Sequence, residues 1–487
     1  MQYWTVGVIS IADFVGTFTG VKKMNCKVEN KEKKSLREDV ANKLQVERWF
    51  AKMSQQELAD KLDTTKSSIS RLESGRQNLT LDYVEAIAQA LGKEVNFNIS
   101  DIVEDIYGDS TDYSLKLYDE TLLKFKLTRD YGLICEIQWI NEERKHLLPL
   151  DLELTNDGVI KWLRGRVIPS NRDMVKKVLA TLKLELSDLK GLIDICMGLS
   201  LNDSYWVVAN VVERQFEEYN LYENRFTEAL SLVAYTGWGY DGNNFKTSPE
   251  LTTGGMLRKC WRMNSKKEIW LYKGGTEGFA NTGNEPYSEF YASQIAEQMG
   301  LKAVKYDLEN LHGILASKCK LFTDIDTSYI PIGRIVKEGG IDAVIDYYKQ
   351  LGEEYYQNLA SMLVFDAVIM NEDRHYGNFG LLRDNHTGKI IDTAPVFDNG
   401  ISLLCYAMKM DFDDNLDEYV NTRSNPYGFE NNYYALAKKV MGHRQKEELR
   451  RLIGFTFEES DVTNLPSWRT GNLEKVVQKR VAELLSL

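Results

Sequence analysis

The strongest constraint on the fold is a run of three short amphipathic helix patterns within residues 54–91, separated by tight turns. Ser54 followed by Glu57 forms a capping box, which starts a helix by satisfying its first free backbone N–H groups. Leu58 and Ala59 lie on one face of that helix, and the small alanine lets a second helix cross closely. The pattern predicts packed helices rather than strands or a polar tail.

The second of these helices has an exposed face that suits contact with nucleic acid. We expect Thr64 or Thr65 to cap it, Ile69 and Leu72 to face inward, and Gly75 to end it with a positive φ. Its exposed side chains combine short hydroxyls with long cations, which suit base edges and phosphates in a major groove: Lys66, Ser67, Ser68 and Arg71. A three-helix bundle with a merely solvated face is the alternative.

This segment resembles the XRE/lambda-repressor family of helix–turn–helix domains over about 55 residues. The motifs that carry the resemblance are Gln-Gln-Glu-Leu-Ala, Ser-Ser-Ile-Ser-Arg-Leu-Glu-Ser-Gly and Leu-Asp-Tyr-Val-Glu-Ala-Ile-Ala-Gln-Ala-Leu-Gly. The resemblance implies that residues 54–76 bind a double-stranded DNA operator, with Gln55 on a phosphate and the four exposed residues near the bases. Because such domains usually dimerise on two-fold operators, it also implies a homodimer.

The charge distribution fits a small DNA-binding module attached to an acidic remainder. The 487-residue chain has a formal net charge of −12, but residues 1–100 carry +2 and the rest −14. A negative net charge of this size argues against a protein that coats nucleic acid or an anionic membrane. It also predicts few phosphate contacts per domain, so dimerisation should matter for tight DNA binding.

Cysteine spacing and hydropathy indicate a cytoplasmic protein with no membrane partner. The six cysteines lie at least 59 residues apart, so no pair has metal-ligand or redox-motif spacing. No run of 18 apolar residues exists, which excludes an ordinary membrane span. The apolar residues 1–21 lack the basic leading region of a signal peptide, and Asp13 interrupts them. Met24 is an alternative to Met1 as the start of translation.

A second group of motifs points to phosphoryl transfer. Asp373 and Asn378 are five positions apart, the interval between the catalytic Asp and the Mg²⁺-binding Asn of a protein-kinase loop. Asp398 follows a predicted hairpin in an Asp-x-Gly setting, where a kinase places its main Mg²⁺ ligand. Oxygen ligands of this kind suit a hard cation that also binds phosphate. Surface turns on a helical domain are the alternative, which the order of the motifs disfavours.

The residues upstream supply the parts of a nucleotide-binding lobe. A predicted strand ends in Lys273, and Glu289 lies 16 residues later in a strongly helical stretch. A helix-borne Glu paired with a strand-borne Lys holds that lysine near the phosphates in kinases. We expect the strand at 314–323 to form the adenine-binding edge and hinge. A flexible loop whose backbone N–H groups approach phosphates is predicted at Thr252, Thr253, Gly254 and Gly255.

Residues 245–400 resemble the HipA family of serine/threonine kinases, the partners of HipB antitoxins in bacterial toxin–antitoxin pairs. The motifs that carry the resemblance are Ser-Pro-Glu-Leu-Thr-Thr-Gly-Gly, Tyr-Lys-Gly-Gly, Glu-Phe-Tyr-Ala-Ser-Gln-Ile-Ala-Glu-Gln-Met-Gly-Leu, Asp-Arg-His-Tyr-Gly-Asn-Phe-Gly and Pro-Val-Phe-Asp. The resemblance implies that the protein uses ATP and Mg²⁺. It assigns Asp373 as the catalytic base, Asn378 and Asp398 as Mg²⁺ ligands, and Lys273 with Glu289 as the ATP-binding pair.

Two positions depart from the family's pattern. Phe397 stands where a tyrosine is common, which is a conservative change. The Thr252–Gly255 loop falls where the family has a phosphate loop that often bears a self-phosphorylated serine. Because threonine replaces serine here, the sequence leaves self-regulation by that route open.

We therefore expect a multidomain chain. An all-α helix–turn–helix domain should precede an α+β, protein-kinase-like (HipA-like) fold with a mostly β N-terminal part and a mostly helical C-terminal lobe. The expected divisions are an extension (1–36), the helix–turn–helix domain (37–97), a linker (98–112), a region without an assigned role (113–240), a nucleotide-binding lobe (241–330) and a helical catalytic lobe (331–487).

The expected function is a toxin–antitoxin-related fusion of a DNA-binding transcriptional regulator with a Ser/Thr protein kinase. Family members with known targets modify aminoacyl-tRNA synthetases, so the resemblance implies a protein substrate of that kind, although no residue here names it. Two alternatives stay open: a regulator whose kinase-like domain senses nucleotide without catalysis, and a small-molecule kinase. The complete set of predicted catalytic residues disfavours the non-catalytic alternative.

Overall fold

The computed structural model describes residues 8–12, 36–51, 53–98, 108–129, 133–182, 184–226, 228–237, 247–278, 281–413, 416–423, 426, 429 and 432–487. Contacts divide the chain into two units. The first contains Met1–Ile106 with Lys176–Leu186 and Thr236–Lys246, and the second contains Tyr107–Val175, Ser187–Tyr235 and Thr247–Leu487. The two units are described separately.

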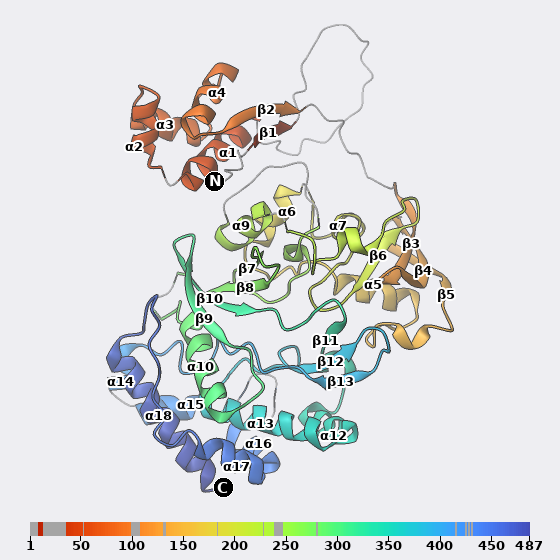
Figure 1. Cartoon of the computed structure of the whole chain (residues 1–487), viewed down its shortest axis with the longest axis vertical. Coiled ribbons are helices and arrows are strands. Elements are labelled where there is room, and N and C mark those ends of the chain that lie inside the picture. Colours follow the sequence, from red (N-terminus) through yellow and green to blue (C-terminus); the bar gives the residue numbers. More distant parts are fainter. Residues whose placement is uncertain are drawn as a thin grey trace. The chain divides into compact units, whose positions relative to one another are not determined.

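Four helices account for most of the first unit: α1 (Leu36–Phe50), α2 (Gln55–Lys61), α3 (Lys66–Glu73) and α4 (Leu81–Ala90) (Figure 1). The expected capping box at Ser54 is present, with both of its reciprocal hydrogen bonds to Glu57. Thr65, not Thr64, caps α3 through a hydrogen bond from Ser68 N–H, and Gly75 has a φ of +69°. The local signals in the sequence therefore start and end these helices where expected.

The core of this unit is small and includes the four residues expected to face inward, Leu58, Ala59, Ile69 and Leu72. It contains Leu44, Leu58, Ala59, Ile69, Leu72, Val84, Ile87, Ala88 and Leu91. A parallel strand pair, β1 (Val8–Ala12) with β2 (Glu94–Asn98), adds to the helices. The sequence analysis placed residues 8–12 in an extension and did not predict this pairing, which joins segments more than 80 residues apart.

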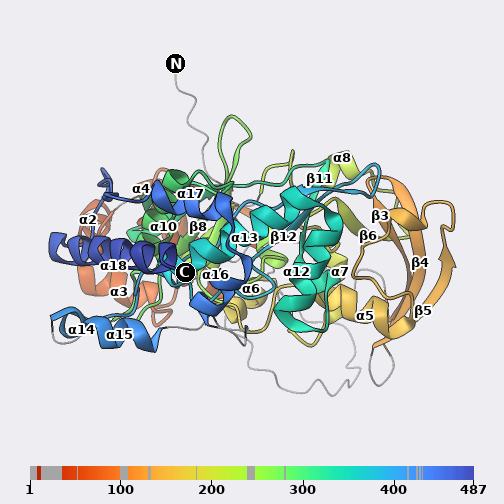
Figure 2. The ribbon, with the colours of Figure 1, turned by 90° about the horizontal axis from the view of Figure 1, so that it is seen from below.

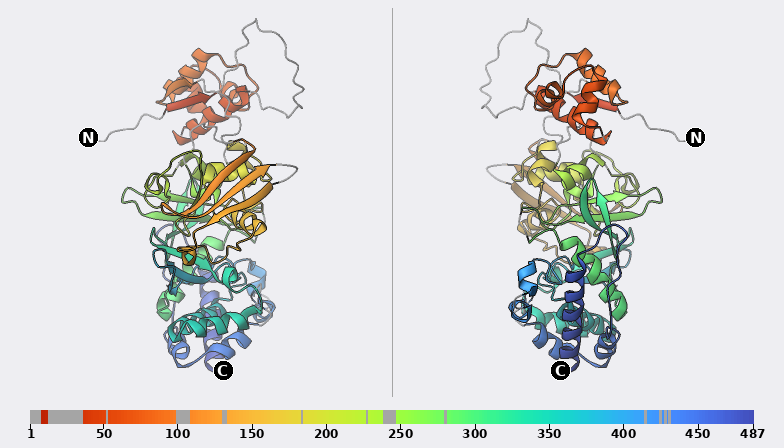
Figure 3. Two further views of the ribbon diagram at one scale, coloured as in Figure 1. Left: turned by 90° about the vertical axis from the view of Figure 1, so that its right-hand side faces the viewer. Right: turned by 90° about the vertical axis from the view of Figure 1, so that its left-hand side faces the viewer.

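A four-stranded antiparallel sheet begins the second unit. Its order is β5-β4-β3-β6, formed by β3 (Ser110–Leu117), β4 (Glu120–Arg129), β5 (Leu133–Ile140) and β6 (Tyr205–Ala209) (Figure 3). Helix α5 (Asn156–Arg164) contacts β5, and α7 (Leu189–Cys196) contacts β6. Strand β6 lies within residues 113–240, the region to which no role was assigned from sequence. All five of its residues are buried, so it lacks the alternation that identifies a half-exposed strand.

A second four-stranded sheet carries the predicted nucleotide-binding elements. Its order is β7-β8-β10-β9, formed by β7 (Lys259–Met263), β8 (Ile269–Gly274), β9 (Tyr306–Leu311) and β10 (Ile314–Lys320). Helix α10 (Glu285–Met299) contacts β8, β9 and β10. Strand β10 lies between β8 and β9, and its role as the adenine-binding edge and hinge stays a prediction. Its pairing with both neighbouring strands places it in the interior of the sheet. No local sequence pattern specifies that pairing.

The C-terminal part is mostly helical, as predicted, and surrounds one long buried helix. Helix α13 (Glu353–Ile369) contacts α12 (Gly340–Leu351), α16 (Tyr433–Val440), α17 (His443–Arg450) and α18 (Ser467–Leu485) (Figure 2). The hairpin expected near residues 380–392 is β12 (Gly380–Asp384) with β13 (Ile390–Thr393), and β11 (Thr327–Pro331) extends it to three strands. The predicted architecture, a helical DNA-binding-type region followed by sheet-rich and helical regions, is confirmed.

Shorter elements complete the described part of the chain. They are the 3₁₀ turns η1 (Lys145–Leu147) and η2 (Pro249–Leu251) and the helices α6 (Val175–Thr181), α8 (Phe216–Tyr219), α9 (Glu228–Thr236), α11 (Ile332–Ile335), α14 (Lys409–Asp413) and α15 (Leu416–Thr422). Among the described residues, no helix combines the length and the apolar character that a membrane crossing requires.

The region with no role assigned from sequence packs against the β12–β13 hairpin. Arg383 of β12 is buried and donates hydrogen bonds to the carbonyl oxygens of His146 and Leu148, at 2.6 and 3.0 Å. It also donates to the Tyr205 hydroxyl at 2.7 Å. These contacts join the first sheet of the second unit to the strands that lead into the candidate site.

Candidate functional site

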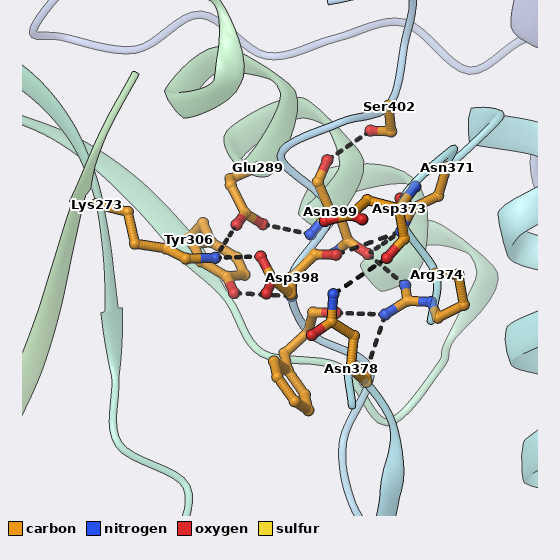
Figure 4. Close-up of polar contacts among 11 residues, drawn as sticks. Lys273, Glu289, Tyr306, Asn371, Asp373, Arg374, Asn378, Asp398, Asn399 and Ser402 are labelled. Atoms are coloured by element: carbon orange, nitrogen blue, oxygen red, sulfur yellow. Dashed lines mark hydrogen bonds and ion pairs between the residues drawn. The ribbon is translucent and has the colours of Figure 1, made fainter. Parts of the chain in front are cut away.

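The ammonium group of Lys273 lies at the centre of the candidate site, near the end of β8. Its Nζ is 2.5 Å from Glu289 Oε1 on α10 and 2.5 Å from Asp398 Oδ1, which comes from a segment 125 residues later (Figure 4). The ring of Tyr306 on β9 lies 5.8 Å from the same ammonium. The structure thus brings together three of the residues that the sequence singled out, on a helix, a strand and a loop.

Glu289 also ties α10 to the segment that carries Asp398. Its Oε2 accepts a hydrogen bond from the backbone N–H of Asn399 at 2.8 Å. Burial raises the pKa of Glu289 above its usual range, although the neighbouring charge of Lys273 opposes that rise. Both carboxylate oxygens therefore have donors in an otherwise buried position.

A second lysine, Lys259, faces the same site and was missed by the sequence analysis. It lies on β7 directly opposite Lys273 in the antiparallel register, and it is 7% exposed. Burial and the like charge of Lys273 lower its pKa from an ordinary value of 10.5 to about 8. One feature of the sequence could have identified Lys259. It lies four residues after the Gly254-Gly255 pair, at a strand position whose side chain points to the same face of the sheet as Lys273.

Asp398 is held in an uncommon backbone conformation. Its φ is +59°, which only a few per cent of non-glycine residues adopt, with Asp among the more tolerant. The Tyr306 hydroxyl accepts a hydrogen bond from the Asp398 backbone N–H at 3.2 Å. Burial alone would raise the pKa of the Asp398 carboxyl, but Lys273 and Lys259 outweigh it and hold that pKa well below its usual range. Asp398 is therefore a carboxylate at neutral pH.

The loop after α13 presents Asp373 next to these groups (Figure 4). Its backbone N–H donates to Asn371 Oδ1 at 3.2 Å, and its carbonyl oxygen accepts from Asn378 Nδ2 at 3.1 Å. Burial raises the pKa of the Asp373 carboxyl above its usual range; His375 opposes that rise and Asp398 adds to it. Its side chain forms no ion pair within the described residues, so it is available to accept a proton.

A buried arginine, Arg374, holds the loop in this conformation. Its Nε and Nη2 donate to the two carboxylate oxygens of Asp366 on α13, at 2.9 and 3.0 Å. Its Nη1 donates to the carbonyl oxygens of Asn378 and Phe397, at 3.0 and 2.6 Å, and its Nη2 also donates to Asn399 Oδ1 at 2.7 Å. One guanidinium therefore connects the helix, the Asp373–Asn378 loop and the Asp398 segment.

The donor set fits a Mg²⁺ ion bound together with phosphate. Because Asn378 Nδ2 donates to the Asp373 carbonyl, the amide orientation leaves Asn378 Oδ1 free to bind a cation. Asp398 supplies an ionised carboxylate. The described residues contain no group of three or more His, Cys, Asp or Glu side chains arranged to hold a metal alone. Mg²⁺ usually binds one or two carboxylates of the protein and takes its remaining ligands from phosphates and water. The carboxylate of Asp398, together with the amide oxygen of Asn378, fits this preference.

The predicted phosphate loop lies beside Lys259. Gly255 has a φ of +84°, a backbone conformation that favours glycine, and a Cβ built on it would lie 2.2 Å from Lys259 Nζ. Gly254 and Gly255 are exposed. The Thr253 hydroxyl donates to the Pro249 carbonyl at 2.6 Å and accepts from the Trp261 indole Nε1–H at 2.9 Å. The loop thus combines a firmly held threonine with an accessible glycine pair.

A fully buried ion pair anchors this loop from the region that had no assigned role. Arg172 Nη2 is 2.5 Å from Glu250 Oε2, and both side chains have zero exposure. Arg172 also donates to the backbone carbonyls of Glu250, Thr253 and Lys259, at 2.6, 3.3 and 3.0 Å. Sequence reasoning missed Arg172 because it lies about 80 residues before the loop and in no motif.

The expected DNA-contacting residues lie together on α3 and at the start of α2. Lys66, Ser67 and Arg71 are exposed and Ser68 is half-buried. Within the described residues, the side chains of Lys66 and Arg71 form no hydrogen bond or ion pair, which leaves both cations available. Gln55, in contrast, is held: its Nε2 donates to Glu73 Oε2 at 2.8 Å.

Comparisons with known proteins support the helix–turn–helix assignment directly. Residues 51–97 match the family model HTH_3, described as helix-turn-helix. A comparison of the sequence with curated proteins gives no match.

Two solved structures are similar to larger parts of the chain. The Helicobacter pylori proinflammatory kinase CtkA is 18% identical, with a TM-score of 0.38, covering 47% of this chain and 93% of that one. The Shewanella oneidensis MR-1 toxin–antitoxin complex of HipA, HipB and operator DNA contains a chain that is 12% identical, with a TM-score of 0.45, covering 77% of this chain and 99% of that one. Both TM-scores lie below 0.5, so the functional assignment below rests on the residues of the site.

Proposed function

We propose that the second unit is an ATP- and Mg²⁺-dependent kinase that transfers the γ-phosphoryl group to a serine or threonine hydroxyl of a protein. The observation that carries this proposal is the bridging position of Lys273 between Glu289 and Asp398, with Asp373 and Asn378 on the adjoining loop. A buried Lys–Glu pair beside an ionised Asp is the arrangement that holds ATP phosphates in kinases.

The residues take complementary roles in the reaction. Lys273 and Lys259 contribute positive charge beside the phosphates, and the exposed Gly254–Gly255 backbone approaches them. Asn378 and Asp398 would hold Mg²⁺, which when bound neutralises phosphate charge. The acceptor hydroxyl oxygen forms a bond to the γ-phosphorus as the bond from that phosphorus to the β–γ bridging oxygen breaks, which releases ADP. Asp373 orients the hydroxyl and accepts its proton.

The raised pKa of Asp373 agrees with this role. A general base works best when its pKa lies nearer the working pH than that of an ordinary carboxylate. The environment instead keeps Asp398 ionised, as binding of a cation requires. Two carboxylates on neighbouring loops thus have pKa values pushed in opposite directions, which supports different roles for them.

The test is a phosphotransfer assay with Mg²⁺ and labelled ATP on the whole chain and on Asp373→Asn. We expect the variant to lose transfer by about 100-fold or more while it still binds ATP. Asp346→Asn, an exposed residue of α12 outside the site, is the matched control. Equal activity of wild type and Asp373→Asn would refute the assignment of the base.

Two outcomes would favour the alternatives over a protein kinase. Stabilisation by ATP without any turnover would indicate a nucleotide-sensing domain. Phosphorylation of a metabolite but of no protein in lysate would indicate a small-molecule kinase. Phosphoproteomics of cells that express wild type or Asp373→Asn would identify the substrate, for which aminoacyl-tRNA synthetases are the candidate class by family resemblance.

We further propose that the helix–turn–helix domain binds an operator as part of a homodimer, which makes the chain a DNA-binding regulator fused to a kinase. The unpaired cations Lys66 and Arg71 on α3 carry this proposal. Replacing both with alanine should weaken operator binding and reduce its salt dependence, because fewer phosphate-neutralising charges remain. Lys266→Ala with Lys475→Ala removes the same charge elsewhere and should leave DNA binding unchanged. Retained binding by the Lys66/Arg71 variant would contradict the proposal.

A further inference from the structure

A cavity of about 270 Å³ lies at the end of β7, on the side of that strand that does not pair with β8. Its walls include Arg225, Phe226, Trp261, Arg262 and Met263. None of these residues belongs to the candidate active site, and all of them lie in the second unit. The cavity is therefore separate from the candidate site, although β7 belongs to the same sheet that carries Lys259 and Lys273.

Two guanidinium groups give this cavity a positive charge. Among the described residues, neither the Arg225 nor the Arg262 side chain forms a hydrogen bond or an ion pair. Nearby Arg172 and Arg258, in contrast, pair with Glu250 and Glu277. Two unpaired guanidinium groups at one cavity favour a dianion, because the planar fork of arginine matches phosphate oxygens and forms paired hydrogen bonds with them.

The rest of the wall mixes apolar side chains with the polar residues Ser231, Asn264 and Ser265. Phe226, Trp261 and Met263 are half-buried and pack on the hydrophobic cluster below this end of the sheet. A pocket with apolar and aromatic walls and a few convergent polar groups is typical of sites for small molecules. The combination favours a ligand that carries a phosphate at one end and a flat ring with hydrogen-bonding groups at the other.

Trp261 connects this cavity to the phosphate loop. Its backbone N–H donates to Glu250 Oε1 at 2.7 Å, and its indole Nε1–H donates to Thr253 Oγ1 at 2.9 Å. Its carbonyl oxygen accepts a hydrogen bond from the Ser231 hydroxyl at 2.9 Å. A molecule that packs against Trp261 therefore contacts the same residue that holds the loop.

We propose that this cavity binds a nucleoside monophosphate, with the phosphate on Arg225 and Arg262 and the base against Phe226 and Trp261. Through its contact with Trp261, the bound nucleotide changes how tightly the Thr252–Gly255 loop binds ATP. This second step rests on the proposed kinase function, whereas the binding itself does not.

The experiment is calorimetric titration of the whole chain with adenosine, guanosine and uridine 5′-monophosphates. Arg225→Gln with Arg262→Gln should weaken binding by about tenfold or more, since each charged hydrogen bond is among the stronger ones in proteins. Lys266→Gln with Lys267→Gln removes two charges from the adjacent turn and should leave binding unchanged. Circular dichroism and thermal melting of each variant establish that it is folded.

Lys273→Ala separates this cavity from the candidate active site. Binding that persists in Lys273→Ala and is lost in the double arginine variant supports the proposal, whether or not the chain proves to be a kinase. Binding lost in Lys273→Ala but retained in the arginine variant would place the nucleotide in the active site and overturn it, as would absence of binding to all three nucleotides. If binding leaves the KM for ATP unchanged, the coupling through Trp261 is wrong.

Discussion

Lys259 and Lys273 lie directly opposite each other on the neighbouring strands β7 and β8, and both side chains are buried. Two like charges at such a position are unfavourable unless carboxylates compensate for them. Lys273 has two such partners, Glu289 and Asp398, whereas Lys259 forms no ion pair in the described part of the chain. Lys259 is therefore the residue of the pair that loses its proton first.

The first prediction concerns the pH dependence of ATP binding. Because the pKa of Lys259 is about 8, its positive charge is present at pH 7 and lost as the pH rises above about 8. ATP affinity should therefore fall between pH 7 and pH 9 in wild type. Lys259→Met should bind ATP more weakly at pH 7 and show a flatter profile, measured by equilibrium titration. An unchanged profile in the variant would show that another group titrates.

The free energy of unfolding should rise with pH over part of that range, whereas ATP affinity falls. The unfolded chain keeps lysine protonated up to its ordinary pKa of 10.5, whereas the folded chain releases this proton near pH 8. Between these values the unfolded state binds more protons, so the free energy of unfolding rises with pH. Urea unfolding without nucleotide should show that rise in wild type relative to Lys259→Met. The comparison of the two proteins cancels the contributions of all other lysines.

The second prediction concerns the anchor of the phosphate loop. Arg172→Met leaves the Glu250 carboxylate buried without its cation, which should lower the free energy of unfolding by about 3–5 kcal/mol. The double variant Arg172→Met/Glu250→Gln should recover part of that loss, because no buried charge then remains unpaired. Chemical denaturation of wild type, Arg172→Met, Glu250→Gln and the double variant gives the coupling energy. Additive effects of the two changes would mean that the pair does not act as a unit.

The third prediction concerns Arg374. Lysine keeps the charge but cannot reproduce the five hydrogen bonds that join Asp366, Asn378, Phe397 and Asn399. Arg374→Lys should therefore reduce kcat for phosphotransfer by about 100-fold, because the loop that positions Asp373 shifts. KM for ATP should change much less, since Lys273 and Glu289 remain paired. A variant with wild-type kcat would show that the loop holds its conformation without Arg374.

The fourth prediction concerns phosphorylation of the loop itself. The Thr253 hydroxyl both donates and accepts a hydrogen bond, so we expect it to stay unmodified when the chain is incubated with ATP. Thr253→Val removes both bonds and should raise the KM for ATP by about tenfold, as the loop loosens. Mass spectrometry of the incubated protein tests the first statement and steady-state kinetics the second. Stoichiometric phosphate on Thr253 would contradict the first.

The fifth prediction concerns the core of the helix–turn–helix unit. Glu73 is 5% exposed and accepts hydrogen bonds from Arg48 Nε and Nη2, at 2.6 and 3.0 Å, and from Gln55. Glu73→Gln should destabilise this unit by about 1–3 kcal/mol, because Arg48 loses its partner. Exposed Glu85→Gln on α4 is the control. DNA affinity should fall with stability, and recover at lower temperature if the recognition face itself is intact.

Much of the site was predictable because its parts lie in local motifs. Asp373 and Asn378 belong to one short loop, and the Asp398 motif follows a hairpin with a clear turn signal. Lys273 and Glu289 could be paired because a strand that precedes a helix packs against it in this kind of lobe. The roles of these residues stay predictions until transfer is measured.

The sequence by itself determined where the helices of the DNA-binding-type unit start and end, and which short motifs carry the chemistry. Both depend on neighbouring residues: a cap acts within one helical turn, and a loop motif acts through its own backbone. Only the tertiary structure decided that Lys259 faces Lys273, that Arg172 anchors the loop, and that β10 lies inside its sheet. Those relationships depend on strand register and on buried contacts between residues about 80 positions apart, which no local pattern records.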